Sequence, residues 1–306
     1  MGIFDMKKFL INITIFFTIV AVVDFAAGHF FFKLQSSYAK GGAGSEYYIC
    51  NNLIEDILVM GSSRAAHHYV SQFFSDNIGL SCYNGGQDGN GIVMQYGRWK
   101  MISKHHLPKL LIYDVEPALD YIINDNERYI DRLKPFTGDS DVNNYIAGLF
   151  PLEQYKLLSK MYRYNYKFLE IISDCVIPSD VNYGYKPQKG SIRQEMINKP
   201  TAIGDISSTK IDKVKLECLQ KLIREAQEKG VQIVLVSSPY WKGYVGADTK
   251  PISELAANMK VPFIDYKDSE ICYNPDWFRD TRHLNDKGAR VFTMDLIRRL
   301  KVLSIF

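Results

Sequence analysis

The chain has 306 residues, enough for one large domain or two small ones, and 46% of them are hydrophobic, which allows a substantial core. A net charge of +3 gives no electrostatic footprint of a nucleic-acid-binding protein. The five cysteines have neither Cys-x-x-Cys nor metal-ligand spacing, which argues against a zinc site and against a dense disulfide framework.

The first long feature is a mostly apolar stretch over residues 9–32, preceded by Lys7 and Lys8. As a helix it would be about 36 Å long, enough for the roughly 20 residues that a bilayer needs. The lysines favour a cytoplasmic amino terminus, which leaves the rest of the chain on the extracytoplasmic side. We expect a signal anchor over residues 1–32. A cleaved secretory signal is the alternative, because Ala26-Ala27-Gly28 offers small residues.

The glycine-rich centre of residues 33–55 predicts a tether. After it, the sequence pattern alternates regularly between strands and helices. The apolar runs predict strands over residues 56–60, 78–83, 110–114, 231–236 and 261–266. Helical periodicity predicts helices over residues 65–74, 92–103, 211–229, 252–259 and 286–301. The pattern indicates a three-layer α/β/α domain over residues 56–306 with a mainly parallel, five-stranded sheet.

Residues 116–207 interrupt this alternation and are rich in Tyr, Asn and Asp. We interpret them as a mostly helical insertion that could cover a site, since long insertions in compact domains tend to be functional or flexible. Apolar residues at helical spacing predict one amphipathic helix over residues 152–172.

Two polar loops far apart in the sequence carry candidate catalytic residues. Gly61-Ser62-Ser63 stands where a strand turns into a helix, and Asp280 stands three residues before His283. One carboxylate can then orient one imidazole, which can activate a serine. The simpler interpretations are a helix cap for the serines and capping or surface roles for Asp280 and His283.

A third loop, residues 84–91, is rich in glycine and could present the backbone N–H of Gly89 to an oxyanion. It has no Gly-x-Gly-x-x-Gly pattern and no Walker-type lysine, so nucleotide binding is not expected. The pairs His67-His68 and His105-His106 are sequence neighbours and do not share a helix face. We therefore expect neither a metal site nor a cofactor.

These motifs resemble the SGNH (GDSL-type) hydrolase superfamily, which implies a flavodoxin-like fold and a serine nucleophile. Gly61-Ser62-Ser63 matches the family's Gly-Asp-Ser block, so Ser63 matches the nucleophile. Asn84, Gly86 and Gly89 match the second block, with Gly89 as the oxyanion donor.

The last block of the family, Asp-x-x-His, matches Asp280 and His283. The resemblance covers residues 56–114 and 211–302 and excludes the insertion. The third block, Gly-x-Asn-Asp, is absent, and Tyr113-Asp114-Val115-Glu116-Pro117 stands in its place. Asn90 or the insertion would have to supply the missing donor, and Asp114 is a further candidate at the site.

The resemblance implies an envelope-anchored serine esterase or O-acyltransferase, acting on an acylated glycan or a small ester with no cofactor and no nucleic acid. The amino terminus would be cytoplasmic and the catalytic domain extracytoplasmic. The alternative is a non-catalytic envelope protein that binds a glycan or a partner on the same scaffold. The missing asparagine favours this alternative, whereas Ser63, Asp280 and His283 favour an enzyme.

Overall fold

The computed structural model describes residues 3–37, 42–122, 127–176, 183–198, 210–242 and 248–306. The chain forms two compact units that interleave in sequence. One comprises Met1–Tyr48 and Ile130–Ser179, and the other comprises Ile49–Tyr129 and Asp180–Phe306.

The second unit is built on a five-stranded sheet in which every pairing is parallel. The strands are β1 (Ile57–Gly61), β2 (Cys82–Asn84), β3 (Leu110–Asp114), β4 (Gln232–Ser237) and β5 (Phe263–Asp265). Their spatial order is β2-β1-β3-β4-β5, the flavodoxin-like order. The expected fold class is confirmed.

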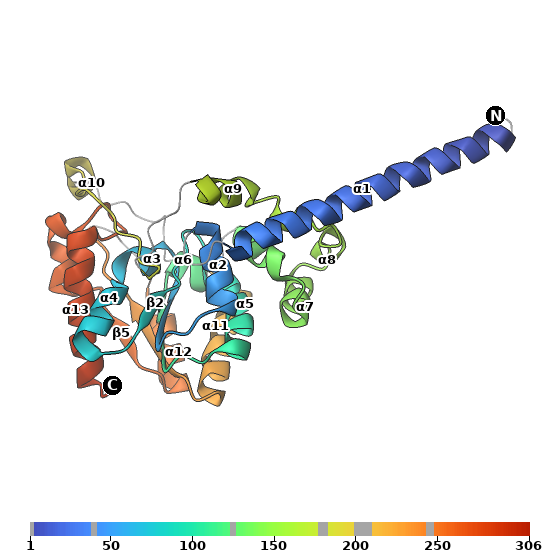
Figure 1. Cartoon of the computed structure of the whole chain (residues 1–306). Coiled ribbons are helices and arrows are strands. Elements are labelled where there is room, and N and C mark those ends of the chain that lie inside the picture. Colours follow the sequence, from blue (N-terminus) through green and yellow to red (C-terminus); the bar gives the residue numbers. More distant parts are fainter. Residues whose placement is uncertain (1–2, 38–41, 123–126, 177–182, 199–209, 243–247) are drawn as a thin grey trace. The chain divides into compact units, whose positions relative to one another are not determined.

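Helices cover both faces of this sheet (Figure 1). The helices of this unit are α3 (Ser63–His68), α4 (Ser71–Ile78), α5 (Ile92–His105), α6 (Pro117–Asp120), α10 (Gln194–Asn198), α11 (Lys213–Glu228), α12 (Lys250–Met259) and α13 (Asp286–Val302). Short 3-10 turns, η4 (Glu270–Tyr273) and η5 (Pro275–Trp277), precede α13. β1 and β3 are buried along their whole length, as expected of strands covered on both sides.

One core lies between the sheet and α13. Ile57, Ile112 and Val234 on the strands pack in one cluster with Phe292 and Leu296 of α13. On the other face α5 packs against α11 (Figure 1). These apolar faces follow the periodicities that the sequence showed, which explains why the elements could be predicted.

Two expected elements differ from the structure. The helix expected over residues 65–74 is divided into α3 and α4, because Tyr69 and Val70 use their backbone groups for tertiary bonds. The Tyr69 carbonyl accepts from Asn84, and the Val70 N–H donates to Thr293. The strand expected over residues 78–83 is shorter in the structure, where β2 begins at Cys82 and α4 continues to Ile78.

The first unit contains α1 (Ile3–Ser37) and a series of short helices. Within Met6–Ser37 of α1, an 18-residue window has a mean hydropathy of 2.3, so this helix is long and apolar enough to cross a membrane, although an amino-terminal signal sequence would share these properties. The other elements are α2 (Gly42–Asn51), which continues into the second unit, η1 (Glu127–Phe136), α7 (Ser140–Leu149), α8 (Glu153–Lys156), η2 (Tyr162–Tyr164) and α9 (Phe168–Val176).

Two expectations for this region need correction. Of the tether expected over residues 33–55, residues 33–37 belong to α1 and residues 42–51 form α2, in which Ile49 and Cys50 are apolar and buried. Residues 38–41 lie outside the described residues. The helix expected over residues 152–172 is broken into α8, η2 and α9. Its backbone turns at Lys160 and Met161, where both N–H groups donate to Asp24. Residues 123–126, 177–182 and 199–207 of the expected insertion lie outside the described residues.

Candidate active site

The expected nucleophile follows β1 at the carboxyl edge of the sheet. Gly61 of β1 pairs with Asp114 of β3, which pairs with Val236 of β4, so three neighbouring strands end at the same level. In open parallel sheets, this edge is where ligands bind. The loops after these strands therefore lie where chemistry is expected.

The turn from β1 into α3 depends on glycine and on a serine cap. Gly61 has φ of +142°, and a Cβ there would stand 2.6 Å from the carbonyl oxygen of Asp114. Only glycine fits this position without strain. The Ser62 side chain accepts the N–H of Arg64 at 3.4 Å and caps α3. The cap expected of the Gly-Ser-Ser motif is therefore Ser62, and the hydroxyl of Ser63 is available for other bonds.

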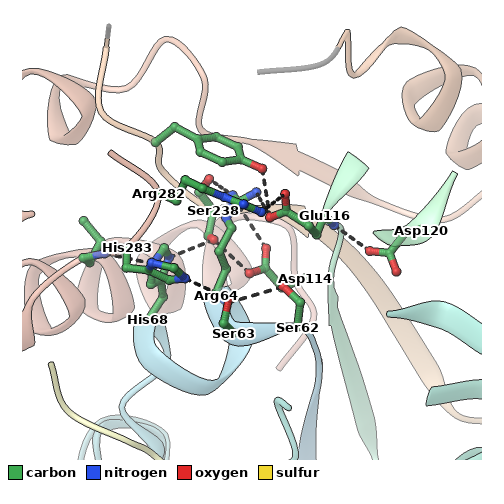
Figure 2. A network of polar contacts seen from close by, with 12 residues as sticks. Ser62, Ser63, Arg64, His68, Asp114, Glu116, Asp120, Ser238, Arg282 and His283 are labelled. Atoms are coloured by element: carbon green, nitrogen blue, oxygen red, sulfur yellow. Dashed lines mark hydrogen bonds and ion pairs between the residues drawn. The ribbon is translucent and has the colours of Figure 1, made fainter. Parts of the chain in front are cut away.

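The structure brings Ser63, His283 and Asp280 together. The Oγ of Ser63 lies 2.8 Å from Nε2 of His283, and the two side chains face one another in Figure 2. The Nδ1 of His283 lies 3.0 Å from both carboxylate oxygens of Asp280. With the Nδ1–H donating to a carboxylate, the Nε2 lone pair is left to accept the hydroxyl proton of Ser63.

The loop that carries Asp280 and His283 is held as a unit. A β-bridge between Phe278 and Leu284 closes it, and one oxygen of Asp280 accepts the N–H groups of Arg282 at 2.8 Å and of His283 at 2.9 Å. Burial opposes the ionisation of Asp280, but the hydrogen bond and charge of His283 and these backbone donors outweigh it and hold its pKa at about 2. The carboxylate is therefore charged at neutral pH.

The glycine-rich loop after β2 lies against α3. The Asn84 side chain accepts the N–H of Gly86 at 2.9 Å and donates to the carbonyl of Ala65 at 2.7 Å. Gly89 is exposed, with φ of +67°, and no atom lies within 4 Å of the position of a Cβ. The side-chain amide of Asn90 donates to the carbonyl of Asp88 at 2.7 Å. Asn90 thus stabilises the turn that contains Gly89.

No protein-family model matches the chain, and its sequence matches no curated protein. A proposed acylhydrolase from Bacteroides fragilis is 11% identical over 82% of this chain and 88% of its own, with a TM-score of 0.39. A GDSL-like lipase from Bacteroides thetaiotaomicron is 9% identical over 81% of this chain and 88% of its own (TM-score 0.38). A two-domain esterase active on acetylated mannans is 9% identical over 80% of this chain and 48% of its own (TM-score 0.38).

Features of the chain itself assign the fold more directly than these distant similarities. The strand order is 2-1-3-4-5, a Gly-Ser-Ser turn follows the first strand, and an Asp-x-x-His loop precedes the last helix. The loop reaches the serine across the carboxyl edge of the sheet. This is the arrangement that the resemblance to the SGNH hydrolases implied, on a flavodoxin-like sheet. The structure also shows what occupies the position of the absent third block.

Asp114, expected as a candidate at the site, has a different place. It is fully buried, and its two oxygens accept the backbone N–H of Ser238 at 3.1 Å and the hydroxyl of Ser238 at 2.9 Å. Burial raises its pKa to about 6, although the charge of Arg64 and the bonds from Ser238 act in the opposite direction. A carboxyl group so enclosed cannot touch a substrate, so the structure places Asp114 beneath the site.

Asp114 belongs to a buried chain of hydrogen bonds. The N–H of Leu284 donates to Nε2 of His68 at 3.0 Å, and Nδ1 of His68 lies 2.9 Å from the hydroxyl of Ser238. Since Nε2 accepts, Nδ1 carries the proton and donates to Ser238, which in turn donates to Asp114. Burial, followed by the charge of Arg64, lowers the pKa of His68 well below its usual value, so the imidazole is neutral.

A second buried cluster is centred on Glu116 and was not predicted from the sequence. Its carboxylate accepts from Arg64 at 3.3 Å, from Arg282 at 2.9 Å and from the Tyr240 hydroxyl at 3.0 Å (Figure 2). The guanidinium of Arg64 also lies 3.6 Å from the centre of the Tyr240 ring and donates to the carbonyl of Ser238. Glu116 therefore joins the residue after Ser63 to the residue before His283.

A third contact involves the glycine-rich loop. Nε2 of His67 lies 3.1 Å from an oxygen of Asp88, and the His67 ring packs edge-on against His283 with centroids 5.7 Å apart. Burial raises the pKa of Asp88, but the hydrogen bond from His67 and nearby positive charges hold it at about 2. The neighbours His67 and His68 thus point to different partners, the first to the glycine-rich loop and the second to the buried chain.

Proposed function

We propose that the chain is a membrane-anchored serine hydrolase that cleaves O-acyl esters, or a related O-acyltransferase. The observation that carries this proposal is the contact of Ser63 with His283 at 2.8 Å, together with the two contacts of 3.0 Å from His283 to Asp280. These distances lie within the reach of a nucleophile, its general base and the group that orients the base. They also weigh against a purely binding role.

The reaction follows from this geometry. Nε2 of His283 removes the hydroxyl proton of Ser63 while Oγ attacks the ester carbonyl, and Asp280 stabilises the imidazolium. The backbone N–H groups of Ser63 and Gly89 hold the oxyanion, each donor contributing about 3 kcal/mol. His283 then returns the proton to the leaving alcohol, and an acyl group remains on Ser63. Water, or an acceptor hydroxyl, attacks this acyl-enzyme and regenerates the serine.

The substrate we propose is an acylated cell-envelope glycan. Lys7 and Lys8, near the start of α1 and ahead of its apolar stretch, favour a cytoplasmic amino terminus, which puts the catalytic unit on the envelope side. Retention of the helix, as opposed to cleavage near Ala27, is supported by the side chain of Asp24, which accepts two backbone N–H groups of the folded chain. Cleavage would remove this partner.

A serine-directed fluorophosphonate probe tests the proposal on the full chain in detergent. We expect the unsubstituted protein to be labelled. Ser63→Ala should lose labelling completely, because the Oγ atom that would bond to the phosphorus of the probe is gone. The matched control is Ser62→Ala, which removes the neighbouring cap and about 1 kcal/mol of stability but keeps the nucleophile. Equal labelling of Ser63→Ala and the unsubstituted chain would exclude Ser63 as the nucleophile.

A second measurement separates hydrolysis from transfer and tests the substrate class. The protein is incubated with an O-acetylated glycan alone, and then with an unacylated glycan acceptor present. Release of free acetate in both cases indicates a hydrolase, whereas acylated acceptor indicates a transferase. If simple aryl esters are cleaved but no acylated glycan is, the esterase proposal stands and the glycan substrate is excluded.

A further inference from the structure

The last third of α1 carries a contact stripe at helical spacing. Its buried or half-buried residues are Asp24, Ala27, Gly28, Phe31, Leu34, Gln35 and Ser36. The ring of Phe31 stacks on Tyr164 with centroids 5.8 Å apart, and both are buried in one cluster with Ile171 of α9. A Cβ at Gly28 would stand 2.3 Å from Cβ of Lys160, so this close approach requires glycine. Figure 1 shows α8 and α9 beside this end of α1.

The same segment satisfies the charge of Asp24. The Ser159 hydroxyl donates to one carboxylate oxygen, and the N–H groups of Lys160 and Met161 donate at 2.7 and 3.1 Å. Asp24 therefore has three donors from one turn. An ionised side chain on an apolar helix is costly in lipid unless the protein supplies such partners.

The depth of Asp24 follows from helix geometry. It lies 16 positions after Lys8, the last charged residue before the apolar stretch. These positions rise about 24 Å along an α-helix, whereas the hydrocarbon core of a bilayer is about 30 Å thick. If Lys8 marks one boundary of an upright helix, Asp24 lies about 6 Å inside the other. The turn at residues 159–161 must then lie at the same depth.

The side chains around this turn are suited to that environment. Large apolar side chains remain exposed on both sides of it, with Leu158 at 77%, Leu152 at 73% and Leu169 at 69%. Tyr155 and Tyr166 are exposed among them, and tyrosine is enriched where lipid headgroups meet hydrocarbon. On α1 itself, Phe25 and Phe30 beside the stripe are also exposed. The apolar surface of α1 thus continues onto the segment that packs against it.

We propose that residues 152–172 form a membrane collar, which inserts into the lipid leaflet on the side of the catalytic unit and shields Asp24 from hydrocarbon. This inference rests on the proposed anchoring by α1. The collar gives the first unit a second membrane contact in addition to α1. The contact between α1 and residues 152–172 then lies within the bilayer.

Fluorescence quenching in vesicles tests the collar. The full chain is reconstituted into phosphatidylcholine vesicles with or without brominated acyl chains, and Leu158→Trp is compared with Val302→Trp, at an exposed position of α13 in the other unit. Emission from the native tryptophans is subtracted with the unsubstituted chain. We expect brominated lipid to quench the Trp added at position 158 by more than half and to leave the Trp added at position 302 unchanged.

The possible failures are distinguishable. Protein that is retained after a carbonate wash but shows no quenching at position 158 would overturn the collar and leave the anchor intact. Protein that washes off would overturn both, without bearing on the esterase chemistry.

A second pair of variants tests the packing. In the Leu158→Trp chain, Gly28→Leu should reduce the quenching because of the contact with Lys160, whereas Ala26→Leu on the exposed side should not. A cooperative unfolding transition like that of the unsubstituted chain verifies that both variants are folded. Equal quenching in the two variants would overturn the claim that α1 positions the collar.

Discussion

The molecule contains two sets of serine, histidine and aspartate at the same sheet edge, and they are arranged differently. In the partly exposed set, histidine stands in the middle, between the hydroxyl of Ser63 and the carboxylate of Asp280. In the buried set, serine stands in the middle, because His68 donates to Ser238 and Ser238 donates to Asp114. Residue types alone therefore do not define a catalytic triad.

The difference lies in which atom is left with a free lone pair. Nε2 of His283 faces a hydroxyl that it can deprotonate, whereas Nε2 of His68 is occupied by the N–H of Leu284. The carboxylates differ as well, since hydrogen bonds hold the pKa of Asp280 at about 2 and burial raises that of Asp114 to about 6. The first arrangement is suited to proton transfer, and the second to holding the loop that carries His283.

The largest expected effect is the difference in kcat/KM between variants of Asp280 and of Asp114. Asp280→Asn should lower kcat/KM for an aryl ester by about 10²–10⁴-fold, since His283 loses the group that orients it and stabilises its charge. Asp114→Asn should lower it less than about tenfold, because Asp114 acts only through Ser238 and His68. Steady-state kinetics on purified variants measures both. Similar losses in the two variants would mean that the buried set participates directly in the chemistry.

The next effect concerns Glu116, which ties the two loops of the exposed set together. Glu116→Gln should lower the free energy of unfolding by about 3 kcal/mol, because it leaves the buried guanidinium of Arg64 without its carboxylate. Denaturant titration in detergent measures this loss. Tyr240→Phe removes a single hydrogen bond to Glu116 and should cost only about 1 kcal/mol. Equal losses would show that the charge of Glu116 is not what holds the cluster.

The smallest effect is a difference in pH dependence. Folding raises the pKa of Asp114 from 3.8 to about 6, so between these values the folded state binds more protons and stability falls as the pH rises. Asp280 acts in the opposite sense, and its contribution is lost as the pH falls from about 4 towards 2. Asp114→Asn should therefore remove about 1–3 kcal/mol of the decline in unfolding free energy between pH 4 and pH 7.

Asp120 provides the control for this measurement. Burial raises the pKa of Asp120 to about 7. In the Asp114→Asn variant, Asp120 should therefore still cause part of the decline in unfolding free energy as the pH rises. Unfolding curves measured at several pH values distinguish a change in slope from a uniform loss of stability. An unchanged slope in Asp114→Asn would contradict the assignment of a raised pKa to that group.

Local patterns were sufficient to predict most of the α/β unit. The strands around Val59, Ile112 and Val234 are buried on both faces, so they appear in the sequence as short apolar runs. The helix around Leu219 and Leu222 shows one apolar face. The candidate site residues could also be identified from the sequence, because Asp280 and His283 are only three positions apart and Ser63 directly follows a predicted strand.

The remaining features depend on contacts that sequence spacing does not encode. Glu116 is charged and stands before a proline, which favours an exposed turn, yet it is buried and paired with Arg64 of α3 and with Arg282 of the loop before α13. The helix expected over residues 152–172 has the right periodicity, but Asp24 of another segment takes its backbone donors at Lys160 and Met161. In both cases a long-range partner outweighs the local preference.

The separation of Ser63 and His283 by 220 positions has a consequence for biosynthesis. The ribosome makes Ser63 220 positions before it makes His283. A nascent chain that has not reached residue 283 therefore carries Ser63 without the imidazole that lies beside it in the folded protein. Under the proposed mechanism, Ser63 stays inactive until His283 has been synthesised and the two sheet-edge loops have come together.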